Sequence, residues 1–579
     1  MNEKSNVAGT STAQPHGMPE TGAPGKYPEP GAAGTRGPWP KGGNFSGNKG
    51  GHVMRFKRLF TRTFKLAACA AAGVFALSVA AEDALPPAIP EFSGLAKAKW
   101  SLGKYGRESA KDGRTFLTVT VPADSPDKSG MNCAETQVDL SKFRGESLCF
   151  MIRVRAKDVS TPRQSYNGVK FMLNYKDGDG REFWHHPSNL KGTFDWRETS
   201  FTVSVSDSAG KGRLQLGLQD SSGEVEFDLS TLRVFRLFPR VNQNYKVKYP
   251  KEVAETPVLR GVMSPHTFTD DDLRTLHDWN VKLVRAQITR DWGKSNTDRD
   301  LAEYDKWLNG KLDHLEDVFR RAEKYGIRFV IDLHSPPGGR GEDRNMTMFF
   351  DKKYADHFVN VWERIAKRFR GNPSVWAYDL VNEPFQTRPA KYDYWNIQRM
   401  AAEAVRRIDP DTPIMIESND WDSAPTYSYL SPLAMDNVIY QVHMYAPGQF
   451  THQFVHNAFG EQGSKADLIK YPGMIGSEKW DKEMIRKHLK PVRDFQLRHN
   501  ARIYVGEFSA IVWAPGAADY IRDCIDVFEE YGWDWTYHAF REWDGWSVEH
   551  EGMPGRLSPS KGNDRKDALL EAFRRGVEK

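Results

Sequence analysis

The sequence predicts an α/β protein, a (β/α)8 TIM barrel preceded by an antiparallel, jelly-roll-like β-sandwich domain. Two patterns lead to this prediction. From residue 258 to residue 579, eight short apolar runs alternate with helical stretches, and eight is the number of strands that a closed barrel needs. From residue 92 to residue 240, short runs alternate apolar and polar residues and are separated by Gly, Asp, Ser and Pro, as the strands of antiparallel sheets are.

The N-terminal part of the chain has the features of a leader and a signal peptide. Residues 1–53 are rich in Gly, Pro, Ser and Asn, so we expect them to be disordered. Residues 54–81 join a basic start to the apolar run Leu66–Val79 and then to small residues, which is the order of a secretory signal peptide. The run is short for a membrane span. We therefore expect a secreted or periplasmic protein with no stable membrane association after cleavage; a retained N-terminal anchor is the alternative.

Composition narrows the choice of partners. The 579 residues suffice for two or three domains, and the formal net charge of +5 is too small to indicate a nucleic-acid partner. The 17 Trp and 21 Tyr offer flat faces that stack on sugar rings, although most aromatic residues fill cores. No CxxC motif or Cys/His cluster indicates a metal, and we expect no cofactor. Whether Cys133 pairs with Cys149 and which oligomer forms both stay open.

Residues 92–240 contain six runs that are predicted to be strands of the β-sandwich. These runs are Thr115–Val121, Ser147–Ala156, Gly168–Asp177, Trp196–Val205, Gly212–Gln219 and Gly223–Leu237. The last run resembles the final strands of jelly-roll carbohydrate-binding modules. A platform for sugar is one interpretation, and a purely structural sandwich is the other; the platform would comprise Tyr166, Trp184, His185, His186 and Trp196. Residues 241–257 are polar and aperiodic and are predicted to be a linker.

Residues 258–579 are predicted to form the barrel, the catalytic domain. Its strands are predicted at Val258–Met263, Val281–Ile288, Ile327–Leu333, Ser374–Val381, Thr412–Glu417, Asn437–His443, Arg502–Gly506 and Asp534–Phe540. Helices are predicted between them at Thr269–Trp279, Asp313–Tyr325, Lys352–Arg370, Lys391–Ile408, Lys482–His499 and Gly516–Tyr531. The helix after the fifth strand is expected to be short, and the segment before Lys482 is a long insertion that should shape the binding face.

Two of these strands deliver a glutamate at their C-terminal end. VWAYDLVNEPF (Val375–Phe385) carries Glu383, and RIYVGEFSA (Arg502–Ala510) carries Glu507. Barrel chemistry takes place at the C-terminal ends of the strands, and two carboxylates are the minimal machinery for cutting a glycosidic bond. Other polar or aromatic side chains fall at the same ends: Arg285, His334, Asn382, His443, Tyr445 and Trp543. The sequence therefore predicts one active site at one mouth of the barrel.

The barrel region resembles glycoside hydrolase family 5, the family of endoglucanases, mannanases and their relatives. The resemblance rests on Asn382-Glu383-Pro384, on Arg285, on His334, on His443-Met444-Tyr445 and on Glu507. It implies that Glu383 is the general acid/base and that Glu507 is the nucleophile that forms a covalent glycosyl-enzyme. It also implies that Arg285 and Tyr445 donate hydrogen bonds to Glu507 and favour its ionised form.

The same resemblance assigns the other residues to substrate binding. Asn382 would bind the 2-hydroxyl of the sugar that is cleaved, His334 and His443 would line that subsite, and Trp543 would be the tryptophan after the eighth strand. The expected protein is a secreted, retaining endo-β-glycanase that acts on β-1,4-linked glucan in polysaccharide or oligosaccharide. The alternatives are a β-mannanase or an exo-β-glucosidase on the same barrel, and a non-catalytic glycan-binding protein.

Overall fold

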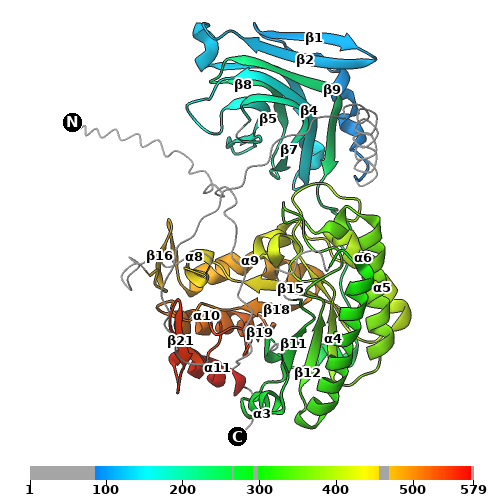
Figure 1. Cartoon of the computed structure of the whole chain (residues 1–579), viewed down its shortest axis with the longest axis vertical. Helices are drawn as coiled ribbons and strands as arrows, with labels where there is room; N and C mark the ends of the chain where they lie inside the picture. The colour runs from blue at the N-terminus through cyan, green and yellow to red at the C-terminus, as the bar shows by residue number, and fades with distance from the viewer. Residues whose placement is uncertain (1–84, 189, 264–266, 291–297, 456–467, 576–579) are drawn as a thin grey trace, which may run out of the picture.

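The computed structural model describes residues 85–188, 190–263, 267–290, 298–455 and 468–575. The predicted leader and signal peptide, residues 1–53 and 54–81, lie outside these residues. Figure 1 shows antiparallel sheets at one end of the long axis of the molecule and a barrel of strands and helices at the other end. None of the helices among the described residues is both long enough and apolar enough to cross a membrane.

The antiparallel part consists of one five-stranded and one four-stranded sheet, ordered β1-β2-β9-β4-β7 and β3-β8-β5-β6. The strands are β1 (Gly106–Lys111), β2 (Arg114–Val121), β3 (Met131–Asp139), β4 (Ser147–Val159), β5 (Gly168–Lys176), β6 (Glu182–His185), β7 (Gly192–Ser204), β8 (Lys211–Gln219) and β9 (Gly223–Arg236). The prediction that antiparallel sheets precede a barrel is confirmed. It missed β1, β3 and β6 because these strands have polar residues in place of a clear alternation, and β1 and β6 are edge strands.

The two sheets enclose one apolar core. Phe150 of the five-stranded sheet stacks on Phe201 of the same sheet, with ring centroids 5.2 Å apart, and Phe171 of the other sheet meets Phe201 edge-on at 4.7 Å. Cys133 lies in β3 and Cys149 in β4, which belong to different sheets, and both thiols are free. The possible Cys133–Cys149 disulfide is therefore absent.

The segment predicted to be a linker, residues 241–257, is packed along the barrel. Val247 is fully buried, and its N–H donates to the carbonyl of His499 at 2.8 Å. The segment then forms a short helix, α2 (Lys251–Ala254), whose Val253 belongs to the apolar cluster that closes the N-terminal end of the barrel. The connection thus covers the N-terminal end of the barrel, called the floor below, just before the first barrel strand.

Eight parallel strands close the barrel in sequence order, as predicted. They are β10 (Arg260–Met263), β11 (Leu283–Gln287), β12 (Arg328–Asp332), β13 (Val375–Asp379), β14 (Ile414–Glu417), β15 (Val438–Met444), β18 (Arg502–Phe508) and β19 (Asp534–Tyr537). All eight predicted strands are present with similar or shorter bounds. The hairpin of β16 (Gly473–Ile475) and β17 (Glu478–Trp480) belongs to the predicted insertion.

Helices surround these strands (Figure 1). They are α3 (Asp270–Asp278), α4 (Leu301–Ala322), α5 (Lys352–Phe369), α6 (Tyr394–Ile408), α9 (Lys482–His499), α10 (Ala517–Glu530) and α11 (Asp564–Phe573), with short turns α7 (Asn419–Asp422), a 3-10 turn (Ala424–Ser428) and α8 (Gly448–Thr451). Helix α4 begins well before the predicted Asp313, because Asp300 caps it by accepting the N–H groups of Ala302 and Glu303. The prediction also missed α11, which packs Phe573 against Trp535 of β19.

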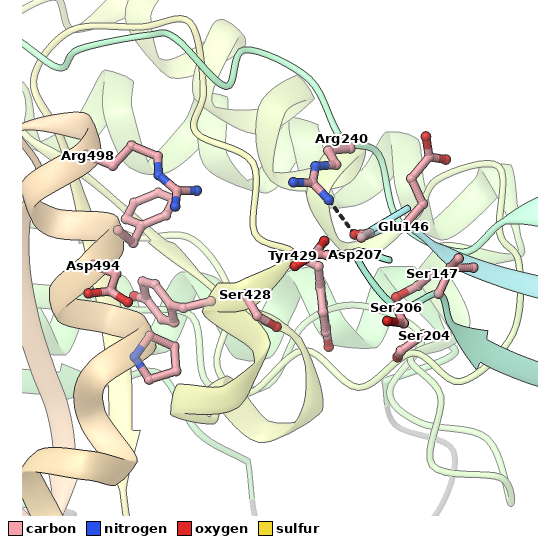
Figure 2. Close-up of a pocket in the computed structure, with 15 residues that line it drawn as sticks. Glu146, Ser147, Ser204, Ser206, Asp207, Arg240, Ser428, Tyr429, Asp494 and Arg498 are labelled. Carbon is pink, nitrogen blue, oxygen red and sulfur yellow. Dashed lines mark hydrogen bonds between the residues drawn. The ribbon is translucent and has the colours of Figure 1, made fainter. Parts of the chain in front are cut away.

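A crevice of about 460 Å³ lies between the sandwich and the barrel (Figure 2). One side is formed by Glu146, Ser206 and Asp207 of the sheets, and the other by Tyr429 and Asp494 of the barrel. The crevice contains none of the side chains predicted to carry the chemistry. Those side chains lie at the C-terminal ends of the barrel strands.

Candidate active site

Arg285 is the centre of the site. It lies in β11 two residues after Leu283, whose side chain belongs to the interior cluster, so Arg285 also points into the barrel and is fully buried. Its Nη1 donates to Glu507 Oε1 at 2.7 Å, its Nε to Asp379 Oδ2 at 2.8 Å, and its Nη2 to Glu417 Oε1 at 2.9 Å and to Asn382 Oδ1 at 3.0 Å. One guanidinium thus positions side chains from three other strands.

Glu507 reaches the interior through a bulge in β18. Val442 of β15 pairs with Val505, but the next residue, His443, pairs with Glu507, so Gly506 is an extra residue. Strict alternation from the interior Tyr504 would turn Glu507 toward the helices, and the bulge turns it inward. Only glycine fits at 506, because a Cβ there would lie 2.5 Å from Cδ of Gln441.

Tyr445 completes the contacts of the Glu507 carboxylate. Its hydroxyl donates to Glu507 Oε2 at 2.9 Å, while Arg285 holds Oε1. Both carboxylate oxygens therefore accept a hydrogen bond, and one of these is charge-assisted. Charge-assisted bonds of this kind hold a carboxylate in one orientation.

Glu383 lies opposite, in the loop after β13, with a left-handed backbone (φ +51°). Its backbone N–H donates to Glu417 Oε2 at 2.5 Å, and its carbonyl accepts from Arg340 Nη2 at 2.8 Å, so the loop is held on both sides. A carboxylate oxygen of Glu383 lies within 4.8 Å of one of Glu507. Burial raises the pKa of Glu383, and the positive charge of Arg340 opposes the rise only in part.

His443 lies between the two glutamates as a neutral imidazole. Burial lowers the pKa of His443 to about 3. Its Nε2 faces the amide nitrogen of Gln441 at 3.2 Å, which makes Nε2 the acceptor, so Nδ1 carries the hydrogen and donates to Glu383 Oε1 at 3.1 Å. His443 therefore orients Glu383 and contributes no charge of its own.

His334 and Asn382 form the next part of the wall. His334 Nδ1 lies 2.8 Å from Asp332 Oδ2, and its Nε2 lies 3.3 Å from the amide nitrogen of Asn382. Burial alone would lower the pKa of His334, but the adjacent charge of Asp332 outweighs it, and the pKa is raised. Asn382 thus links His334 to Arg285.

The mouth holds more carboxyl groups than cations. Asp332, Asp379, Glu417 and Glu507 all lie within 3.4 Å of Arg285. Burial raises the pKa of Asp379 to about 7, against the opposing charge of Arg285, and raises the pKa of Glu417 well above its usual range. Burial thus favours the neutral form of these two carboxyl groups beside the catalytic pair.

Trp543 lies at the rim. Its ring is partly buried and contacts Trp513 at 6.5 Å and Trp546 at 5.7 Å between centroids. Trp546 is the ring next to the catalytic side chains, 6.1 Å from Tyr445 and 5.7 Å from His538. The sequence prediction assigned Trp543 to the site, and the structure places Trp513 and Trp546 against it.

Several side chains of the site escaped the sequence prediction: Arg340, Asp379, Glu417, Gln441, His538 and Glu542. Glu417 had a usable signal, since it ends the predicted fifth strand just as Glu507 follows the seventh. His538 and Glu542 had none, because they follow the eighth strand in a segment rich in other polar residues.

The cluster is poorly suited to a metal ion. Glu383, His443 and Glu507 each offer a ligand atom within 4.8 Å of the others. Arg285 and Tyr445 already occupy both oxygens of Glu507, and Arg285 already supplies the positive charge that a cation would bring.

The barrel region of the chain is similar to known proteins. A family model described as Cellulase (glycosyl hydrolase family 5) matches residues 250–544, just over half of the chain. Endoglucanase C of Acetivibrio thermocellus is 27% identical over 295 residues, which are 46% of this chain and 83% of that protein. Cellodextrinase A of Ruminococcus flavefaciens is 25% identical over 281 residues, which are 47% of this chain and 79% of that protein.

A solved structure described as an endoglucanase from the hyperthermophilic Thermotoga maritima is also similar. It covers 54% of this chain and 96% of its own chain, with 20% sequence identity and a TM-score of 0.41.

Proposed function

The chain belongs to glycosyl hydrolase family 5, a family of retaining glycosidases, and on this premise we propose that it is an endo-β-glycanase that hydrolyses β-1,4-linked glucan. One observation carries the proposal. Two carboxyl groups face each other within 4.8 Å at the barrel mouth, and one of them, Glu507, is held by Arg285 and Tyr445. Retaining enzymes place these groups about 5–5.5 Å apart, whereas inverting enzymes leave about 6.5–9.5 Å for a water.

Two displacements follow from this arrangement. Glu507 attacks the anomeric carbon while Glu383, whose pKa is raised by burial, acts as the acid and gives its proton to the leaving oxygen. Glu383, now a carboxylate, then takes a proton from water, whose oxygen displaces Glu507. Glu383 changes its protonation in both steps, so its environment has to tolerate both the neutral and the ionised form. The neutral His443 and the nearby Arg340 provide such an environment.

The glucan substrate is proposed because relatives described as endoglucanases match this chain at 83% of their length. The test is a panel of soluble β-glucans and mannans, with reducing-sugar release and viscosity measured together. An endo-glucanase lowers the viscosity of β-1,4-glucan early, at low release of reducing ends. Release from mannan alone would favour a β-mannanase, slow viscosity loss would favour an exo-β-glucosidase, and no release would leave a glycan-binding protein.

A second function is proposed for the four-stranded sheet, whose outer face is polar and buried. Leu214 and Leu216 of β8 face the core, so Gln215 between them faces outward, as does Lys170 of β5. Gln215 is only 6% exposed, and its Oε1 has no hydrogen-bond partner among the described residues. Burial lowers the pKa of Lys170 to about 8. A face that combines an unpartnered polar atom with an exposed aromatic ring on the same sheet suits a sugar.

That ring is Trp184 of β6, which is 49% exposed, with Tyr166 50% exposed near the same sheet. The five residues considered as a sugar platform from the sequence do not lie together, because Trp196 is in β7 of the other sheet, beneath Arg155. His185 stacks toward Tyr175 of the core, and burial lowers its pKa to about 4. We therefore propose that glycan binds over Trp184 and Gln215.

Affinity electrophoresis of the whole chain in gels with soluble β-glucan tests this site. The background is Glu507→Ala, so that the gel is not digested. Trp184→Ala should abolish the retardation that the sandwich contributes, and Trp196→Ala, the matched aromatic on the other sheet, should keep it. Equal retardation of the two variants would contradict glycan binding at Trp184.

Export is proposed from the sequence of residues 54–81. N-terminal sequencing of the exported protein should begin near Ala81 or Glu82. A chain that keeps Met1 or Met54 and sediments with membranes would support an N-terminal anchor instead.

A further inference from the structure

A histidine and a glutamate that the double displacement does not use form a chain of hydrogen bonds to the nucleophile. Glu542 Oε2 lies 2.9 Å from Nε2 of His538, Nδ1 of His538 is hydrogen-bonded to the hydroxyl of Tyr445, and this hydroxyl lies 2.9 Å from Glu507 Oε2. Gln287 of β11 donates to Glu542 at 3.1 Å and fixes the far end. This chain of hydrogen bonds therefore runs from the loop after β19, through the residue that follows β15, to β18.

The directions of these bonds follow from the charge on His538. A protonated imidazole donates from both nitrogens, so Nε2–H points to Glu542 and Nδ1–H points to the Tyr445 oxygen. The Tyr445 oxygen then accepts from His538, and its own hydrogen has Glu507 as the acceptor. A neutral His538 that accepts at Nδ1 would instead draw the phenol hydrogen away from Glu507. The protonation of His538 thus decides where the Tyr445 hydrogen lies.

The surroundings of His538 favour the protonated form. Burial lowers the pKa of His538, but the charge and hydrogen bond of Glu542 outweigh burial, and the pKa is raised. Glu542 itself is held ionised: burial would raise its pKa, but His538 lowers it to about 2. The other titratable groups that act on this pair are Glu507, Glu383 and Tyr445 on the site side, and His334 across the mouth.

We propose that the His538–Glu542 pair is a charged positioning unit that acts on Glu507 through Tyr445 and assists the second displacement; this rests on the function proposed above. In that step the bond between the anomeric carbon and Glu507 breaks, and its electron pair returns to Glu507. The water oxygen forms the new bond to carbon, and the water proton goes to Glu383. His538 neither gains nor loses a proton.

The effect differs between the two displacements. The imidazolium Nδ1 lies 3.8 Å from Glu507 Oε2. A fixed positive charge there stabilises the carboxylate that leaves in the second step, and gives no such help to the first step, in which the carboxylate loses its charge. Removal of the charge should therefore slow breakdown of the glycosyl-enzyme more than its formation. A residue that merely supports the fold would slow both.

His538→Gln and Glu542→Gln test the proposal with an aryl β-glycoside whose leaving group is acidic, so that breakdown of the intermediate limits kcat. We expect kcat to fall about 10- to 100-fold, a pre-steady-state burst of phenol to appear or grow, and KM to fall in parallel. The ratio kcat/KM, which reports the first step, should change less than about threefold. His550→Gln is the matched control, since His550 pairs with Asp544 at 3.3 Å outside this chain of bonds.

Two further measurements keep the proposal falsifiable. Glu542→Asp keeps the charge and should recover most of kcat, whereas in Glu542→Gln the second step should recover only as the pH falls and His538 regains its proton. Nitrogen NMR of the wild-type histidines should show His538 still protonated above the ordinary titration range, whether or not a substrate is known.

Each failure has its own signature. If the wild-type protein cleaves no glycoside, the proposed function fails, and the NMR titration still decides the charge of His538. If the wild type is active, equal losses in kcat and kcat/KM in folded His538→Gln and Glu542→Gln, an unchanged kcat, or a neutral His538 at neutral pH would each overturn the proposal.

Discussion

Each end of the barrel holds an arginine, fully buried at the mouth (Arg285) and partly buried at the floor (Arg502), and the two are used differently. At the floor, Arg502 donates from Nε and Nη2 to the two oxygens of Asp534 at 2.6 and 2.7 Å, and its Nη1 donates to the carbonyls of Val253 and Thr256. At the mouth, Arg285 faces four carboxyl groups. The floor joins one cation to one anion, whereas the mouth sets four carboxyl groups around one guanidinium.

This difference separates stability from chemistry. The ion pair at the floor has its hydrogen bonds made, and it ties β18 and β19 to the segment before β10. Unbalanced buried carboxyls cost stability and have shifted pKa values, as in Asp379 and Glu417. The ratio of carboxyl groups to cations thus distinguishes the structural network at the floor from the network at the mouth.

The largest expected effect is at Glu507. Glu507→Ala should lower turnover by about ten-thousand-fold or more, because the variant lacks the carboxylate on which the covalent intermediate is proposed to form. Added azide should restore turnover and yield a glycosyl azide of inverted configuration, which chromatography and NMR would identify. Glu571→Ala, an exposed glutamate on α11, is the control. Activity that survives in the Glu507 variant would remove its assignment as nucleophile.

Glu383→Ala should have the next largest effect, and it should depend on the substrate. Loss of the acid should cost about 10²–10⁴-fold on natural glycans, whose leaving groups need a proton. The first step on an aryl glycoside with an acidic leaving group should hardly change, and single-turnover kinetics would measure it. Equal losses on both kinds of substrate would mean that Glu383 is not the acid.

At the floor, Arg502→Met should act on stability alone. It leaves the buried Asp534 without its cation and with the Leu259 N–H as a remaining donor, so the free energy of unfolding should fall by about 3–5 kcal/mol, measured by denaturant titration. The pH dependence of the folded enzyme should stay unchanged. The double variant Arg502→Met with Asp534→Leu should regain much of the loss. A shifted pH profile in the single variant would contradict the claim that the floor ion pair affects stability alone.

The smallest expected effect is at Arg340. Its charge opposes the rise in the pKa of Glu383, so Arg340→Gln should raise that pKa further. Because Glu383 has to be protonated for the first step, the alkaline limb of kcat/KM should move up by about 0.5–1 pH unit. Arg344→Gln, in the same loop, should leave the limb in place. A shift to lower pH would contradict the sign.

Much of the barrel could be predicted from the sequence, since strand periodicity and helix amphipathicity are local properties. The floor contacts could not, because residues 241–257 are polar and aperiodic and become ordered only through partners such as His499, more than two hundred residues away. The same holds for the start of α4, where one cap residue, Asp300, extends the helix beyond its clear apolar pattern. The roles assigned to Glu383, Glu507 and the surrounding residues stay predictions.

The sequence by itself determined that eight strands alternate with helices and that Glu383 and Glu507 follow two of them. The tertiary structure decided which way Glu507 points, since Gly506 is an extra residue in the pairing with β15, at a place where Gln441 of that strand leaves no room for a Cβ. It also decided that His538 and Glu542, and not Trp543 alone, reach the nucleophile. The physical reason is that strand alternation has a period of two, so one extra residue reverses a side chain, and only pairing with another strand reveals it.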